Sequence, residues 1–504
     1  MQSLLKNYWH LACCFALYCA LAALPTPLLA QSASAAPEVT APNIQADIQA
    51  KIPAIETYIA QQMQRNRIPG MAVAIVSNGS VVYTRGFGTD GFGAPVTERT
   101  GFVLGSMSKS FTALAVMQRV ERNQIQLDAP AQKYLPWFRV LDAAASVQIT
   151  VRQLLHHTSG IPTNAARATG ASPTLTDQVR ALTDVKLHHT PGTVHEYSSP
   201  NYLVLGAIVE SVTQQSFGSY VQESIFTPLG MQDSYVDQNS ALELKNPGRL
   251  SSGHVYTFGF PLARTLPSEG SRLPTAALIS SAADMGRFLV AQLRTDSSSL
   301  LSAAGLAQMH TGGAPSAGFS YAFGWRDGTI AGERAVHHGG IVANFRGKMV
   351  MFPNQKLGVV VLTNVSSMIP WPVAPASHVM ADDIAAALIG VALPVPSDKH
   401  RWLFGAIFAV MLLLPMLQLR SLLRIIRGQN IGGSRLRIGI LTFIDLVFVA
   451  GVAFVIPRLA RLSWSELLSV APDVSWWLII EVTLSLLTVG ARFMQVARKA
   501  LSFR

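Results

Sequence analysis

The chain has 504 residues, of which 49% are hydrophobic and only 13% are charged. This length exceeds one ordinary domain, and the composition indicates that apolar membrane segments accompany a soluble domain. The net charge of +11 is concentrated in residues 401–504, which carry 12 Lys and Arg against 4 Asp and Glu. Residues 31–400 carry 26 basic and 24 acidic residues, so the charge pattern argues against a nucleic-acid partner.

The N-terminus has the layout of a secretory signal peptide. Lys6 precedes an apolar run at about residues 11–24, and small residues follow it. We predict a signal peptide over residues 1–30, with cleavage between residues 30 and 36; the alternative is an uncleaved anchor helix. Cleavage would leave a mature chain without disulfides or a thiol nucleophile, because all three cysteines lie in this segment: Cys13, Cys14 and Cys19.

The next 350 or so residues alternate between strand and helix patterns. A helix is expected at 46–66 and a hairpin at 71–83, where Asn78-Gly79 forms the tight turn. A second helix pattern covers 106–123, and an irregular, helix-containing stretch continues to about residue 310. The remaining expected elements are strands at 335–338, 345–352 and 357–362 and a helix at 378–389. We predict an α+β fold in which both ends of the domain build one antiparallel sheet beside an all-helical lobe.

The first candidate for chemistry is Ser106-x-x-Lys109, at the start of the second helix pattern. This spacing places both side chains on one side of a helical turn, so the amine can reach the hydroxyl. The motif alone is weak evidence, since a chance copy occurs at Ser3-x-x-Lys6. The structural alternative is a helix N-terminus capped by a serine, Ser108 for example, with a solvated lysine.

Two further motifs lie far along the chain. Tyr197 makes a poor base unless a cation such as Lys109 favours its phenolate, and a buried structural tyrosine is the alternative. His338-Gly339-Gly340 leads into a strand on which a substrate can lie closely. The backbone N–H of Ile341 there could pair with that of Ser106 as an oxyanion hole, and a plain hairpin turn is the alternative.

Taken together and in this order, the motifs resemble the serine β-lactamase and penicillin-recognising superfamily, specifically its class C-like branch, over about residues 50–390. Further stretches that support the resemblance are Leu127-Asp128-Ala129-Pro130, Ile149-Thr150-Val151-Arg152-Gln153-Leu154-Leu155-His156-His157-Thr158-Ser159-Gly160, Pro228-Leu229-Gly230-Met231 and Tyr321-Ala322-Phe323-Gly324-Trp325. The resemblance implies a β-lactamase/transpeptidase-like fold in a serine hydrolase domain at 37–392. It also implies that Ser106 is the acylated nucleophile, Lys109 its activator and Tyr197 the general base and acid.

Two departures from the family pattern bear on the substrate. Ser199 stands where the family has an amide that contacts acyl side chains. His338 replaces the lysine that grips a penicillin carboxylate, so a permanent cation becomes a titratable imidazole. Ser199, His338, Gly339, Gly340 and Ile341 are therefore the expected substrate-binding residues. They favour an ester, an amide or a D-amino-acid peptide over a β-lactam.

Two other functions remain open on the sequence alone. One is a true β-lactamase, and the other is a non-catalytic membrane receptor that binds cell-wall fragments. We expect no cofactor and no metal. Adjacent histidine pairs occur (156–157, 188–189 and 337–338), but neighbours on a strand point to opposite faces, and the chain contains no His-Glu-x-x-His motif.

The tail is expected to anchor the protein in a membrane. Residues 393–401 read as a stiff linker, and residues 402–495 as a three-helix transmembrane region. Each of its apolar stretches approaches the ~20 residues that cross a bilayer as a helix; they are 402–419, 438–457 and 474–491.

Charge between these stretches sets the expected orientation. The loop at 420–437 carries five arginines and no acidic residue, so the positive-inside rule places it and the C-terminus in the cytoplasm. Residues 31–400 would then lie outside the cytoplasm, in a multi-pass protein of the cell membrane. Asp445 and Glu481 fall within the spans, where hydrogen bonding between helices is the favoured explanation and a polar relay or a partner-binding face the alternative.

Overall fold

The computed structural model describes residues 44–165, 174–237, 241, 250–264, 272–294, 300–367, 376–395, 399–429, 435–460 and 463–501. The chain forms two compact units, one of residues 39–396 and one that contains residues 397–504. The predicted signal peptide at residues 1–30 lies outside the described residues.

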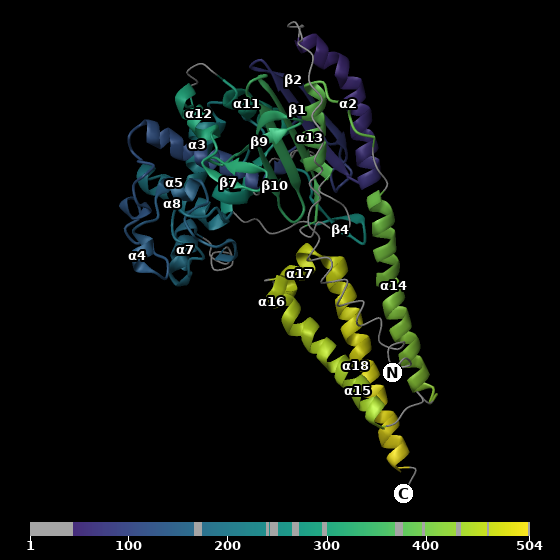
Figure 1. Cartoon of the computed structure of the whole chain (residues 1–504). Helices are drawn as coiled ribbons and strands as arrows, with labels where there is room; N and C mark the ends of the chain where they lie inside the picture. The colour runs from purple at the N-terminus through teal and green to yellow at the C-terminus, as the bar shows by residue number, and fades with distance from the viewer. Residues whose placement is uncertain are drawn as a thin grey trace. The chain divides into compact units, whose positions relative to one another are not determined.

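The centre of the first unit is an eight-stranded antiparallel sheet with the order β2-β1-β12-β11-β10-β9-β8-β7 (Figure 1). β1 near the N-terminus pairs with β12 near the end of the domain, with Met71 opposite Thr363. Both ends of the domain therefore build one sheet, as the sequence predicts. The strands are β1 (Gly70–Ser77), β2 (Ser80–Gly88), β7 (Ala314–Ser316), β8 (Phe319–Tyr321), β9 (Arg326–Ile330), β10 (Glu333–Ile341), β11 (Arg346–Phe352) and β12 (Leu357–Thr363).

Every residue of β1 is buried, because both faces of the sheet are covered. Met71, Val73 and Ile75 belong to one hydrophobic core, and Ala72 and Ala74 belong to the other, as the alternation of strand side chains requires. Helices α2 (Ile44–Asn66) and α13 (Ala376–Leu388) cover the first face (Figure 1). Helix α11 (Ala282–Gln292) packs on the second.

The predicted helical lobe adjoins the second face and surrounds α3 (Ser108–Glu121) and α8 (Ser199–Thr213). Its shorter helices begin at side-chain caps; Thr150, for example, forms a capping box with Gln153 at α5. These shorter helices are α4 (Ala143–Ser146), α5 (Val151–Leu155), α7 (Leu175–Arg180), α9 (Phe217–Val221) and α12 (Ala303–His310).

The sequence pattern did not predict β7, β8 and β9 of the main sheet, and it did not predict two small sheets elsewhere in the domain. One consists of β13 (Val365–Ser366), β4 (His254–Thr257) and β5 (Phe260–Ala263), and the other of β3 (Phe102–Val103) and β6 (Ile279–Ser280). Strands of two to four residues are too short to show a period of two in the sequence, which explains why they were missed.

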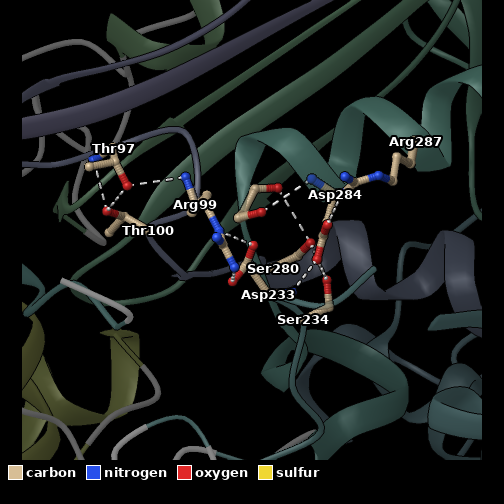
Figure 2. Close-up of polar contacts among 9 residues, drawn as sticks. Thr97, Arg99, Thr100, Asp233, Ser234, Ser280, Asp284 and Arg287 are labelled. Atoms are coloured by element: carbon tan, nitrogen blue, oxygen red, sulfur yellow. Dashed lines mark hydrogen bonds and ion pairs between the residues drawn. The ribbon is translucent and has the colours of Figure 1, made fainter. Parts of the chain in front are cut away.

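A polar network lies around the β3–β6 pair (Figure 2). Asp233 accepts hydrogen bonds from Arg99 at 3.0 and 3.2 Å. The fully buried carboxylate of Asp284 accepts from the Asp233 backbone N–H at 2.7 Å and from the Ser234 hydroxyl at 2.9 Å, and it also pairs with Arg287. β3 is followed in the chain by the segment at residues 105–109, so this network lies beside the strand that leads to the candidate nucleophile.

The second unit contains the helices α14 (Lys399–Ile426), α15 (Arg435–Ala450), α16 (Ile456–Ala460), α17 (Trp464–Val470) and α18 (Pro472–Leu501). Three segments are long and apolar enough to cross a membrane: Gly405–Ile426, Ile438–Leu459 and Pro472–Arg498.

The two carboxylates of the tail have different surroundings. Asp445 on α15 pairs with Arg492 on α18 at 2.5 Å, which confirms the expected interhelical contact for this residue. Glu481 is only 1% exposed, and neither of its carboxylate oxygens has a hydrogen-bond partner among the described residues. The interhelical hydrogen bond expected for Glu481 is therefore not found there.

Candidate active site

Ser106 lies in a single 3-10 turn, η1 (Gly105–Met107), between β3 and α3. Gly105 has a φ of +57°, and a Cβ on it would lie 2.6 Å from the backbone nitrogen of Ile341. Glycine is therefore required here both by its backbone conformation and by the close approach of β10. The serine cap of the structural alternative is absent: Met107 is the N-cap of α3 without a side-chain cap, and the Ser108 hydroxyl instead accepts from the Leu278 N–H at 3.3 Å.

Lys109 is completely buried at the start of α3. Its Nζ donates to the hydroxyl of Ser106 at 3.2 Å, to that of Ser199 at 3.2 Å and to the backbone oxygen of Thr275 at 2.9 Å. The three acceptors match the three N–H groups of an ammonium. The amine is thus held against the candidate nucleophile by two segments distant in sequence, and the solvated-lysine alternative is wrong.

Tyr197 lies just before α8, with the centre of its half-buried ring 5.1 Å from Lys109 Nζ. Its buried hydroxyl has no hydrogen-bond partner among the described residues. A structural tyrosine in a core normally satisfies its hydroxyl, whereas a proton-transfer group must be free to meet the reacting atoms.

Ser199 contacts the lysine through its hydroxyl, as described above. The resemblance implied a contact with the acyl group at this position. The structure shows that the serine also serves as an acceptor that orients Lys109, a role that the sequence did not suggest.

His338 is fully buried on β10, and its ring makes two hydrogen bonds. Nδ1 lies 2.7 Å from the Gly339 oxygen and Nε2 lies 3.1 Å from the Tyr321 hydroxyl, so Nδ1 donates and Nε2 accepts. Burial, with the charges of Arg326 and Lys109, holds the pKa of His338 well below 6.5. The side chain is thus a neutral imidazole where the family pattern has a cation.

Gly339 and Gly340 allow β10 to contact η1, the turn that carries Ser106 (the nucleophile turn). A Cβ on Gly340 would lie 1.9 Å from the Leu104 oxygen, a distance that no side chain can occupy. Together with the closeness of Gly105 to the Ile341 nitrogen, this contact brings the Ile341 N–H beside the turn that carries Ser106. A plain hairpin turn at these glycines is excluded, because they lie inside β10.

Several residues around Tyr197 were not singled out as site residues from the sequence. His157, Tyr202 and Tyr321 pack around the same centre, with ring centroids of His157 4.4 to 5.0 Å from those of Tyr197, Tyr202 and Tyr321. His157 and Tyr321 belong to stretches that carry the family resemblance, and this was the sequence signal that could have identified them as site residues. The described residues contain no group of three or more His, Cys, Asp or Glu that could hold a metal.

Comparisons with known proteins identify the family of this chain. A family model described as Beta-lactamase matches residues 55–370. Protein flp of Staphylococcus aureus (strain COL) is 28% identical over 453 residues, a match that covers 86% of this chain and 87% of that protein. Penicillin-binding protein 4 of Amycolatopsis lactamdurans is 33% identical over 255 residues, covering 48% of this chain and 65% of that protein.

Solved structures show the same fold. The octameric penicillin-binding protein homologue from Pyrococcus abyssi superimposes with a TM-score of 0.58 at 27% identity, covering 69% of this chain and 79% of that one. A class C beta-lactamase gives a TM-score of 0.56 at 21% identity, covering 69% of this chain and 98% of that one. Since the family match spans more than half of the residues, the chain belongs to the Beta-lactamase family and has its mixed helix-and-sheet, transpeptidase-like fold.

Proposed function

We propose that the protein is a membrane-tethered, extracytoplasmic serine hydrolase that acts through an acyl-enzyme. The observation that carries this proposal is the position of Lys109, which donates to Ser106 and lies against the ring of Tyr197. A receptor that only binds fragments has no need for an activated serine, a buried amine and a free phenol at one point.

In the proposed reaction, Tyr197 accepts the hydroxyl proton as Ser106 Oγ bonds to the substrate acyl carbon. The backbone N–H groups of Ser106 and Ile341 stabilise the oxyanion that forms on the carbonyl oxygen. Tyr197 then returns the proton to the leaving group as its bond to the acyl carbon breaks. Water hydrolyses the resulting ester by the same route, with Tyr197 first accepting and then returning a proton to Ser106.

The substrate is an ester, an amide or a D-amino-acid peptide rather than a β-lactam. A neutral His338, bonded to Tyr321 and Gly339, offers no permanent charge to the carboxylate of a penicillin. Ser199, already engaged by Lys109, replaces the family's amide. Both features remove contacts that recognition of a β-lactam uses in the class C pattern, and neither affects attack on a neutral acyl group.

The proposed placement in the cell envelope rests on the three apolar helices, the arginine-rich loop and the signal-peptide pattern. Site-directed labelling tests it, because the mature chain would contain no cysteine. Ser80→Cys, at the exposed turn end of the β1–β2 hairpin, is expected to react with a membrane-impermeant maleimide on intact cells. Gln429→Cys, between the first two spans, is expected to react only after lysis. The reverse pattern would invert the topology.

The activity test uses the full-length protein in detergent. Hydrolysis of p-nitrophenyl esters and labelling by a fluorophosphonate, which phosphonylates activated serines, are compared in the wild type, Ser106→Ala and a control, Ser80→Ala. Loss of both signals in Ser106→Ala alone supports the proposal. Equal activity in all three would show that the nucleophile is misplaced. Lack of labelling in a folded wild type would favour the receptor, and turnover of nitrocefin would favour a β-lactamase.

A further inference from the structure

His157 holds the chain on both sides of Tyr197. Its backbone oxygen accepts a hydrogen bond from the N–H of Glu196 at 2.9 Å, and its ring Nδ1 accepts one from the N–H of Ser198 at 3.2 Å. The residue between these two donors is the candidate general base. One histidine thus fixes the backbone that precedes the phenol and the backbone that follows it.

The imidazole also contacts the phenol directly. The ring centroids of His157 and Tyr197 are 4.4 Å apart at an interplanar angle of 43°, while Lys109 Nζ lies 5.1 Å from the centre of the same phenol ring. Displacement of the imidazole would therefore remove one of the surfaces that keep the phenol next to the lysine.

The protonation state of His157 is set by its partners. Nδ1 accepts a hydrogen bond from the Ser198 N–H and also lies 3.0 Å from Asn201 Nδ2. The Ser159 hydroxyl donates to the Asn201 side-chain oxygen at 2.6 Å, which orients the amide so that its NH₂ group faces Nδ1. Nδ1 is therefore an acceptor and the ring proton lies on Nε2, which has no partner among the described residues. Burial and the charge of Lys109 hold the pKa of His157 well below 6.5.

The backbone of His157 is in an unusual conformation. Its φ is +58°, just beyond the C-terminal end of α5, where the Thr158 N–H bonds to the Gln153 oxygen at 2.8 Å. Left-handed conformations are uncommon for residues other than glycine and asparagine, and they concentrate at functional sites. Glycine would suit this turn better, but it would supply neither the ring nor the Nδ1 acceptor.

We propose that His157 is the positioning residue of Tyr197, holding the phenol against Lys109 and Ser106 through the hydrogen bonds to Glu196 and Ser198 and through ring contact. This inference rests on the proposed function, in which Tyr197 transfers the proton. His157 itself touches no reacting atom.

The test compares two substitutions in the full-length protein. His157→Leu keeps an apolar side chain but removes the Nδ1 acceptor, whereas His157→Asn retains an acceptor near that position and tolerates a left-handed φ. We expect His157→Leu to lower kcat for a p-nitrophenyl ester about 100-fold with KM changed less than about threefold, since the loss lies in orientation. His157→Asn should recover most of kcat. Equal losses in the two variants would overturn the proposal.

A double-mutant cycle separates positioning from general structural damage. Tyr197→Phe alone should lower kcat strongly, and adding His157→Leu should lower it little further, because the group being positioned is already absent. A full additional loss in the Tyr197→Phe background would overturn the proposal. If His157→Leu fails to fold, the cycle is run with Ser159→Ala, which frees the Asn201 amide and should show the same non-additivity on a smaller scale.

The wild type and Ser106→Ala are measured in the same series. Absence of hydrolysis that depends on Ser106 would overturn the proposed function and this inference with it. An active wild type whose kcat is unchanged by His157→Leu would overturn this inference alone.

Discussion

Gly340→Ala tests whether contact between β10 and the nucleophile turn is required for acylation. The added Cβ would lie 1.9 Å from the Leu104 oxygen and 3.3 Å from the terminal methyl of Met107. Close carbon–oxygen contacts in proteins lie at about 3.3 Å, so the strand and the turn must separate by more than about 1 Å. The obstacle is backbone, which cannot rotate away as a flexible side chain can.

That displacement acts on the proposed oxyanion hole, because the two N–H donors belong to the two segments that separate. Loss of one such donor lowers kcat by about 10²–10³-fold, or about 3–4 kcal/mol of transition-state stabilisation. We expect a loss of this size for Gly340→Ala, measured as kcat for ester hydrolysis and as the rate of fluorophosphonate labelling, with thermal unfolding recorded to show that the variant folds.

The neighbouring glycine provides a matched control on the same strand. A Cβ on Gly339 would point to the other face, 2.7 Å from Cε1 of His378, a side chain that can shift. Gly339→Ala leaves the contact between β10 and the turn that carries Ser106 in place, so it should lower the unfolding temperature and reduce kcat at least tenfold less than Gly340→Ala does. A folded Gly340→Ala protein with wild-type labelling kinetics, or an equal loss of kcat in both variants, would show that this contact is not what acylation requires.

Two further predictions concern stability. Asp284→Ala should lower the free energy of unfolding by about 2 kcal/mol in chemical denaturation, because it leaves the buried Asp233 N–H without its acceptor. Arg287→Gln changes a side chain that is 47% exposed and should lower this free energy by less than about 1 kcal/mol. A larger loss in Arg287→Gln than in Asp284→Ala would contradict this prediction. Burial lowers the pKa of His310 from 6.5 to about 3, so between these values the unfolded chain binds the extra proton and stability falls as the pH is lowered. Near pH 5, His310→Asn should make the dependence of unfolding free energy on pH shallower by up to about 1.4 kcal/mol per pH unit, and an unchanged slope would exclude this role for His310.

The sequence predicts five strands of the main sheet (β1, β2, β10, β11 and β12) because their signals are local, whereas β7, β8 and β9 were not predicted. The apolar run of β1 and the Asn78-Gly79 turn are contained in a dozen neighbouring residues. Asn78 and Gly79 both have positive φ, 48° and 78°, as a tight hairpin turn of this kind requires. β1 and β12 are both apolar strands, and they lie near the two ends of one domain. Their composition and their order in the chain therefore indicate that they belong to one buried sheet.

The surroundings of Lys109 could not be predicted in the same way. Its partners include the Thr275 oxygen, a backbone group that carries no residue-type signal and lies 166 positions away. Likewise, Ser199 could be noted as a departure from the family pattern, but its role as an acceptor for the lysine depends on how α8 packs beside α3. Contacts of this kind depend on how helices and strands pack against one another. The periodicity of hydrophobic residues in one sequence does not reveal that packing.

The role of His157 shows why residues that depart from the family pattern must be considered together with residues that match it. The family's cation at the His338 position is absent, so Lys109 is the charge that the described site places beside the phenol, and the phenol must be held close to it. His157 does this through its hydrogen bonds to the backbone N–H groups of Glu196 and Ser198. These bonds do not depend on the side chains at positions 199 and 338. A site built this way can exchange its substrate-contacting residues while the geometry of proton transfer is preserved, because positioning and recognition depend on different side chains.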